Sequence, residues 1–151
     1  MGLWNGTPRL DGLRVLLVEG APPVRQVVAE VLAEYGAHVT AVDSAVAGLA
    51  ILKREKPDAL LSSLSMRDKD GYWLIREVRK LPPDQGGDVP AAAFTGLTTA
   101  EDRLATLQAG FQYHVPKPAD LSLLVEVVAL LTLKRSEAGE HRATMALSLG
   151  D

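Results

Sequence analysis

Four polar residues stand at or just after the ends of short apolar runs, and their types could support chemistry. They are Glu19, Ser63, Thr95 and Lys117. If these runs are strands of one parallel sheet, their carboxyl ends meet at one edge, which is where ligand chemistry belongs in such folds. Glu19 is the one plausible base for the Ser63 hydroxyl. Glu19 and Lys117 also carry opposite charges, so our hypothesis is a direct ion pair across the site, and the alternative is that Lys117 faces solvent.

Several common active-site motifs are absent from the sequence. The first loop, EGAPPVRQ, has one glycine and two prolines, so it lacks the run of backbone amides that a phosphate-binding loop needs. There is no Gly-x-Ser-x-Gly motif and no pair of histidines at metal-binding spacing on a helix. Because the chain has no cysteine, disulfides, thiolate nucleophiles and zinc-thiolate sites are excluded. The sequence therefore gives no support for a common enzyme class.

The elements that would position these residues alternate between short apolar runs and longer segments with helical spacing. Runs at 13–18, 37–42, 59–64, 89–94 and 113–115 are typical of strands in a parallel sheet. The predicted helices follow them at 23–35, from Ser44 to before Pro57, after the loop 65–71, from Thr98 or Thr99 to Gly110, and at 119–133. Five such pairs predict an α/β fold: a doubly wound, five-stranded parallel sheet.

A single domain accounts for most of the chain. Its 151 residues are 47% hydrophobic and 23% charged, as is usual for one globular domain. We expect this domain at residues 13–133, a linker or flexible segment at 1–12, and a flexible tail at 134–151. The net charge of −3 gives no reason to expect nucleic-acid binding. No apolar stretch could span a bilayer and no signal peptide is present, so we expect a cytoplasmic protein without membrane contact.

Four stretches of sequence carry a family resemblance across residues 13–133. They are LRVLLVEG with Arg25 five residues later, PDALLSSLSMRDKDG, AFTG and AGFQYHVPKP. Together they resemble the receiver domains of two-component response regulators. The resemblance implies a flavodoxin-like (βα)5 fold, in which an aspartate accepts a phosphoryl group beside a magnesium ion. It also implies binding to a histidine kinase or another signalling protein through the face of the fourth helix, fifth strand and fifth helix.

The sequence departs from the family pattern at the residues that carry this chemistry. The acidic pair of the first loop falls on Glu19 and Gly20, and the acceptor aspartate falls on Ser63. Lys117 is retained, and Thr95 is retained either as a remnant switch or as a strand-end hydroxyl bonded to the backbone. One glutamate and a serine hydroxyl are a poor donor set for magnesium, so we expect its binding to be lost or very weak. These departures predict a pseudo-receiver that is no enzyme and acts through protein-protein contacts.

Residues near this site leave further interpretations open. His114 falls at the aromatic switch position of the family, where it could titrate near neutral pH or serve as a half-buried packing residue. Asp58, Asp68 and Asp70 are expected to be exposed loop charges that do not point into the pocket.

Two other functions and several settings stay open as well. The chain could be an active phosphoacceptor that uses Ser63, or a small-molecule sensor that uses the vacated acidic pocket. It could be a stand-alone adaptor or a segment of a hybrid sensor kinase, and it could form a homodimer.

Overall fold

The computed structural model describes residues 6–117 and 120–136, and it contains the predicted doubly wound fold. Five parallel strands form one sheet in the order β2-β1-β3-β4-β5. The strands are β1 (Arg14–Val18), β2 (His38–Val42), β3 (Ala59–Ser63), β4 (Ala91–Thr95) and β5 (Tyr113–Pro116). The helices are α1 (Pro22–Glu34), α2 (Ala45–Glu55), α3 (Gly71–Arg79), α4 (Ala100–Ala109) and α5 (Leu121–Ser136), with a short 3-10 helix at Pro83–Gln85.

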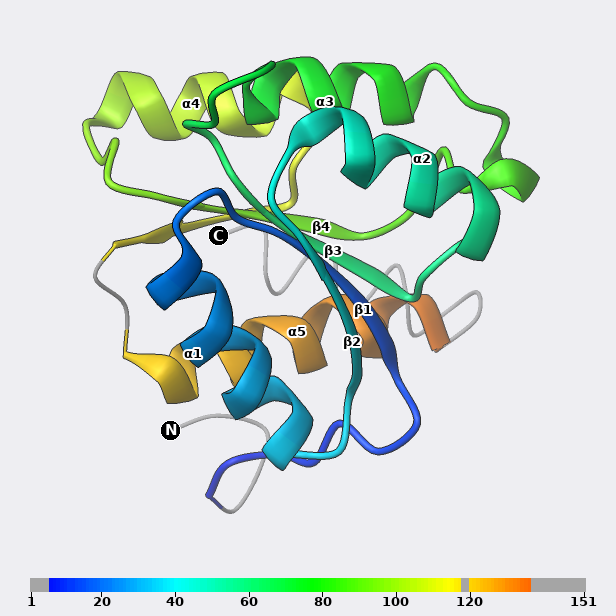
Figure 1. Cartoon of the computed structure of the whole chain (residues 1–151), viewed down its shortest axis with the longest axis vertical. Helices are drawn as coiled ribbons and strands as arrows, with labels where there is room; N and C mark the ends of the chain where they lie inside the picture. Colours follow the sequence, from blue (N-terminus) through cyan, green and yellow to red (C-terminus); the bar gives the residue numbers. More distant parts are fainter. Residues whose placement is uncertain (1–5, 118–119, 137–151) are drawn as a thin grey trace.

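Helices cover both faces of the sheet, with α2, α3 and α4 on one side and α1 and α5 on the other (Figure 1). Successive strand side chains point to opposite faces. Val15 and Leu17 therefore join the core under α1 and α5, whereas Leu16 and Val18 join the core under α2 and α3. This two-sided burial explains why the strand sequences are apolar at nearly every position.

Local sequence signals set the helix boundaries. Pro22 and Pro23 occupy the first turn of α1, where their missing N–H groups cost no helical hydrogen bond. Ser44 caps α2, and Thr99 caps α4 in a reciprocal capping box with Asp102. The predicted helix start at Ser44 is therefore confirmed, and of the two starts that the sequence left open for α4, Thr98 and Thr99, the structure has Thr99.

The predicted boundaries of the domain need correction at its amino end. Leu10 was expected in a linker or flexible segment, yet it is fully buried in the core under α1 and α5. Its N–H donates to the carbonyl of Tyr35 at 2.7 Å, and the N–H of Gly12 donates to Gly36. At the other end, α5 continues to Ser136, and residues 137–151 of the predicted tail lie outside the described residues.

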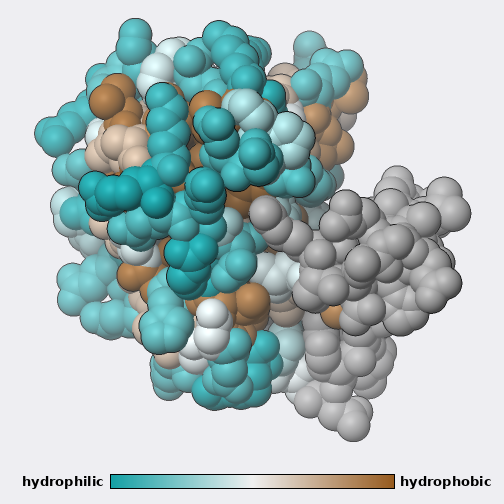
Figure 2. Space-filling model, turned by 90° about the vertical axis from the view of Figure 1, so that its right-hand side faces the viewer, coloured by the Kyte–Doolittle hydropathy of each residue, from teal (hydrophilic) through white to brown (hydrophobic). Residues whose placement is uncertain are grey.

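Hydrophilic and hydrophobic residues are unevenly distributed over the surface of the molecule. The face turned toward the viewer in Figure 2 is predominantly hydrophilic, with hydrophobic residues in small separate patches. Within the described ranges, no helix combines the length and the apolar character that crossing a membrane requires.

Candidate functional site

The carboxyl end of the sheet brings three of the predicted polar residues into direct contact. Glu19 follows β1, Ser63 ends β3 and Lys117 follows β5. The Lys117 Nζ atom lies 2.7 Å from Glu19 Oε1 and 3.1 Å from Ser63 Oγ. Lys117 is 98 positions from Glu19 and 54 from Ser63 in the chain, and the parallel sheet brings the three residues together.

The predicted ion pair between Glu19 and Lys117 is present and mostly shielded from solvent. The Glu19 side chain is 3% exposed and that of Lys117 is 26% exposed. The second carboxylate oxygen of Glu19, Oε2, accepts a hydrogen bond from the N–H of Ala21 at 3.0 Å. The Lys117 ammonium also lies 4.9 Å from the centre of the Phe94 ring, a cation-π contact. Both charged groups are therefore held by several partners.

Ser63 is buried, and its hydroxyl oxygen accepts a hydrogen bond. Its Oγ accepts from Lys117, and its own hydroxyl has one long contact, 3.5 Å, to the carbonyl oxygen of Ser65. A hydroxyl needs a neighbouring base before it can act as a nucleophile. The one carboxylate at this point, Glu19, has both oxygens engaged by Lys117 and Ala21.

Thr95 lies at the same edge of the sheet but makes a different set of contacts. Its buried Oγ1 accepts a hydrogen bond from the N–H of Leu97 at 3.0 Å, and its carbonyl accepts from the N–H of Lys117 at 2.7 Å. This is the arrangement of a strand-end hydroxyl bonded to the backbone, one of the two interpretations that the sequence left open.

A cavity of about 620 Å³ opens beside the ion pair, with Gly20 in its wall. Besides Glu19 and Lys117, three charged side chains line it: Arg25, Asp43 and Arg67. An added Cβ at Gly20 would meet its nearest neighbours, the Asp43 carbonyl and Met66 Cγ, at 3.7 and 3.8 Å. This position therefore has room for a side chain.

Two arginines that the sequence does not mark as site residues, Arg25 and Arg67, line the pocket. Arg25 Nη1 donates to the carbonyls of Glu19 and Gly20, at 2.9 and 3.4 Å. Arg67 is 82% exposed and reaches Asp43 at 3.4 Å. Their positions are visible in the sequence, because Arg25 lies one turn into α1 and Arg67 follows Met66 in the loop after β3. An arginine alone, however, does not predict a pocket.

The loop carboxylates have structural partners and do not enter the pocket. Asp68 accepts hydrogen bonds from the N–H groups of Ala45 and Val46, which ties the loop after β3 to the start of α2. Burial acts to raise the pKa of Asp68, but backbone N–H groups, chiefly that of Val46, bond the charged form and hold the pKa below its usual value. Asp70 caps α3, and Asp58 accepts from the N–H of Arg14.

His114 is half-buried on β5 and bonds to α4. Its Nδ1 lies 3.0 Å from Thr106 Oγ1, and the Thr106 hydroxyl donates to the Asp102 carbonyl at 2.8 Å. Because Thr106 has a single hydroxyl proton, the neutral ring donates from Nδ1. Burial lowers the pKa of His114 and the charge of Arg103 acts in the same direction, while the Leu97 backbone and the Asp102 charge favour the protonated ring and oppose the shift.

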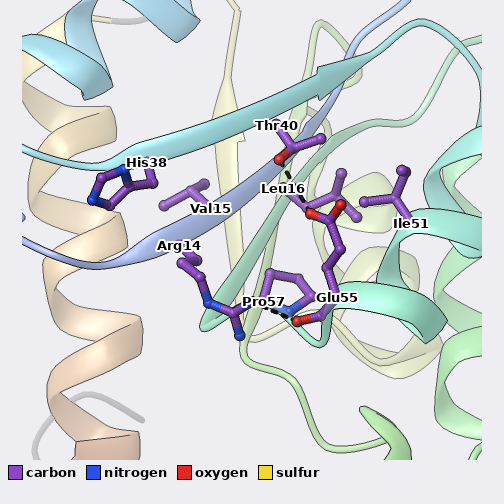
Figure 3. A pocket seen from close by; sticks show the side chains of 8 residues that line it. All are labelled: Arg14, Val15, Leu16, His38, Thr40, Ile51, Glu55 and Pro57. Atoms are coloured by element: carbon purple, nitrogen blue, oxygen red, sulfur yellow. Dashed lines mark hydrogen bonds between the residues drawn. The ribbon is translucent and has the colours of Figure 1, made fainter.

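A second cavity, of about 410 Å³, lies at the opposite end of β1 (Figure 3). Arg14, which lines this cavity, donates to the carbonyls of Glu55 and Lys56 at the end of α2, both at 2.6 Å. Thr40 bonds the Glu55 carboxylate, and Leu16 and Ile51 supply apolar wall. This cavity contains none of the predicted site residues, and its arginine serves to hold the end of a helix.

The described residues contain no group of three or more His, Cys, Asp or Glu side chains that could hold a metal ion. At the predicted site the donors are the Glu19 carboxylate, which is engaged by Lys117 and Ala21, and the Ser63 hydroxyl, which faces an ammonium group. The Asp43 carboxylate in the cavity wall is paired with Arg67. Magnesium prefers several anionic or well-directed oxygens in octahedral geometry. This donor set does not fit it.

Comparisons with known proteins agree with this architecture. An uncharacterized 14.6 kDa protein in the sodA1 3' region of Leptolyngbya boryana is 38% identical over 79% of this chain and 89% of its own length. The response regulator MprA of Mycobacterium leprae is 30% identical over 92% of this chain but only 59% of its own length. The sensor histidine kinase RcsC of Salmonella typhimurium is 28% identical over 80% of this chain and 12% of its own length. The chain thus spans little more than half of the named response regulators.

A solved structure and a family model match the same region. The receiver domain of the sensor histidine kinase PA1611 from Pseudomonas aeruginosa, solved with a magnesium ion in its active site cleft, has a TM-score of 0.73. It is 30% identical, and the match covers 80% of this chain and 98% of that domain. The model of the response regulator receiver domain matches residues 15–129. The chain therefore belongs to the response regulator receiver domain family of two-component signalling.

Proposed function

We propose that this receiver domain is a pseudo-receiver, which signals through protein-protein contacts without being phosphorylated and without catalysing a reaction. One observation carries the proposal: the lysine at the family's phosphoryl-binding position is already bonded to a buried carboxylate and to the serine at the acceptor position. In this interpretation the Glu19–Lys117 pair holds the domain in one state, and no phosphoryl group is needed to hold Lys117 in place.

Two further features support the absence of phosphotransfer. A serine cannot form an acyl phosphate, and the Ser63 hydroxyl has no free base beside it among the described residues. The donor set argues for very weak magnesium binding, and phosphoryl transfer depends on a cation to offset the charge that gathers in the transition state. The same donor set supports a protein that requires no cofactor.

The partner surface that we propose is the face of α4, β5 and α5. Receiver domains in two-component systems interact with kinases or other signalling proteins, and this face carries large apolar side chains that are open to solvent. Leu104 is 56% exposed, Leu107 is 48% exposed and Leu123 is 39% exposed. These leucines lie on α4 and α5, two elements of the proposed face, and exposed apolar side chains favour a protein partner. We propose a histidine kinase or another signalling protein here, with a homodimer as the other candidate.

The likeness to a region of the kinase RcsC and to the receiver domain of the kinase PA1611 supports one setting, a receiver segment of a hybrid sensor kinase. The likeness to MprA supports the other, a response regulator or adaptor. In both settings the pocket would have the same role, because Glu19, Ser63 and Lys117 all lie within the matched domain.

Phosphorylation is tested with acetyl phosphate and magnesium, read by intact mass. We expect no mass gain. A gain of one phosphoryl group that disappears in Ser63→Ala would instead identify an active phosphoacceptor and overturn the proposal.

The constructive test restores the missing acids. The double variant Gly20→Asp with Ser63→Asp should bind beryllofluoride in the presence of magnesium, because it restores both carboxylates and a Cβ at Gly20 meets no closer neighbour than 3.7 Å. The parent chain and Gly20→Asn with Ser63→Asn, which has the same size without the charge, should not bind it. A folded Asp variant that stays inert would show that the loss of function involves more than these two carboxylates.

A further inference from the structure

The charges around the cavity beside Gly20 do not suit a cation. Three basic side chains line it, Arg25, Arg67 and Lys117, against the two carboxylates Glu19 and Asp43. Lys117 and Glu19 neutralise one another at 2.7 Å. What remains facing the cavity is two guanidinium groups and one carboxylate.

Arg25 is the uncompensated charge of this set. Its side chain donates hydrogen bonds to two backbone carbonyls, and within the described ranges no carboxylate lies within ion-pair distance of it. Arg67 has Asp43 at 3.4 Å, but with side chains 82% and 50% exposed this pair is weak and can open. Two guanidinium groups are therefore available to a negatively charged ligand, which they bind through planar, paired donors.

Backbone donors point to the same class of ligand. Among the described residues, the N–H groups of Gly20, Ser65 and Met66 donate to no protein acceptor, and all three residues line the cavity. Ser65 and Met66 are consecutive, and successive backbone N–H groups form anion-binding concavities. The absent side chain at Gly20 leaves the space that an acidic side chain would fill.

We infer that this cavity binds a small oxyanion of the phosphate class, either free phosphate or the phosphate group of a small molecule, without covalent transfer and without a metal ion. The inference rests on the proposed function and deepens it, because it names the ligand class of the vacated pocket. Arg25 and Arg67 would supply charge, and the amides of Gly20, Ser65 and Met66 would supply directed donors. Asp43 would turn from Arg67 toward solvent when the anion enters.

The test is a titration of the full chain, labelled with ¹⁵N, in the absence of magnesium and at constant ionic strength. The probes are inorganic phosphate and methyl phosphate, with sodium chloride as the control salt. We expect saturable shifts that are largest at the amides of Gly20, Ser65 and Met66. Equal affinity for both probes would indicate recognition of the phosphate group itself, and tighter binding of inorganic phosphate would indicate a site for the free ion. Shifts that fail to saturate, or that the chloride control reproduces, would overturn the inference.

Matched variants separate charge from shape. Gly20→Asp places a carboxylate beside Arg25 and should weaken phosphate binding about tenfold or more. Gly20→Asn has the same size without the charge and should keep most of the affinity. Arg67→Gln, at an exposed position that leaves the fold intact, should weaken binding as well. Equal loss in the Asp and Asn variants would overturn the inference, because a charge effect requires them to differ.

Failure of this inference and failure of the proposed function can be told apart. A chain that gains no phosphoryl mass from acetyl phosphate and shows no saturable phosphate shifts refutes the anion site alone. A chain that gains that mass at Ser63 refutes the pseudo-receiver itself.

Discussion

Helices α3 and α4 lie on the same face of the sheet (Figure 1), yet they are held to it by different forces. Helix α3 buries Leu74, Ile75 and Val78 completely, together with Gly71. Helix α4 buries a single residue, Thr106, which is polar. Burial of three large apolar side chains contributes several kcal/mol, whereas a hydrogen bond contributes about 1 kcal/mol net.

The contrast indicates that α4 can move away from the sheet with a smaller free-energy change than α3. The hydroxyl of Thr106 bonds the Asp102 carbonyl of its own helix and His114 of β5, and Tyr72 of α3 lies 3.5 Å away. Meanwhile Leu104 and Leu107 face solvent. A helix with few buried apolar contacts opens locally more easily than its neighbours. This agrees with the proposal that α4 belongs to the partner surface.

The largest effect is expected from Leu74→Ala, which would test whether apolar burial holds α3. Removing a fully buried leucine side chain should lower the free energy of unfolding by about 2–5 kcal/mol. Urea denaturation followed by circular dichroism measures it. A loss below about 1 kcal/mol would contradict the conclusion that apolar burial holds α3 to the sheet.

A smaller effect is expected from Thr106→Val, which keeps the shape and removes the hydroxyl. The loss of the bond to His114 should cost about 1 kcal/mol. Amide hydrogen exchange should become faster in α4 and stay unchanged in α3. Equal acceleration in both helices would show that α4 is not an independent unit.

A pH effect should also be confined to the α4 side. The folded state lowers the pKa of His114 chiefly through burial, so the unfolded chain binds its proton more readily. The contribution of this group to stability is therefore complete above pH 6.5, the ordinary value, and declines as the pH falls from there toward the folded pKa. Denaturation of the parent and of His114→Gln at pH 7.5 and 5.5, values chosen about one unit to either side, measures it. If His114→Gln loses as much stability on acidification as the parent, His114 is not the source of the pH effect.

The smallest effect on stability is expected from Leu104→Ala and Leu107→Ala, which should change the free energy of unfolding by less than about 0.5 kcal/mol each. The same variants should weaken self-association or binding to a cognate kinase, measured by sedimentation or by co-purification with that kinase. A large loss of stability would mean that these leucines pack inside the domain.

Much of the fold follows from the sequence, because apolar runs and helix caps are local signals. The strands at 14–18 and 59–63 lie within their predicted runs, and Ser44 and Thr99 cap their helices as expected. The contact of Glu19 with Lys117 was also predictable, since both residues end strands of one parallel sheet and carry opposite charges. Thr95 at the end of β4 is placed by the same rule.

What the sequence could not supply depends on contacts between distant residues. Asp68 bonds amides 22 and 23 positions earlier, and no local pattern indicates such a partner. Leu104 and Leu107 have ordinary helical spacing, and spacing cannot say whether that side of α4 is covered. Arg25 and Arg67 line one cavity because the loops after β1 and β3 are adjacent, which follows from the strand order.

The burial of Leu10 has a practical consequence for anyone who trims this domain. The segment around it runs along α5 and, with Ala129 and Leu133, walls a hollow of about 250 Å³. A clone that starts at Leu13, where the recognisable motif begins, would leave an empty hole beneath α1 and α5 and strip two backbone bonds from the turn after α1. Expression designs should therefore retain the residues from Pro8 onward, because Pro8 lines this hollow and Leu10 fills the core, although both precede the family motif.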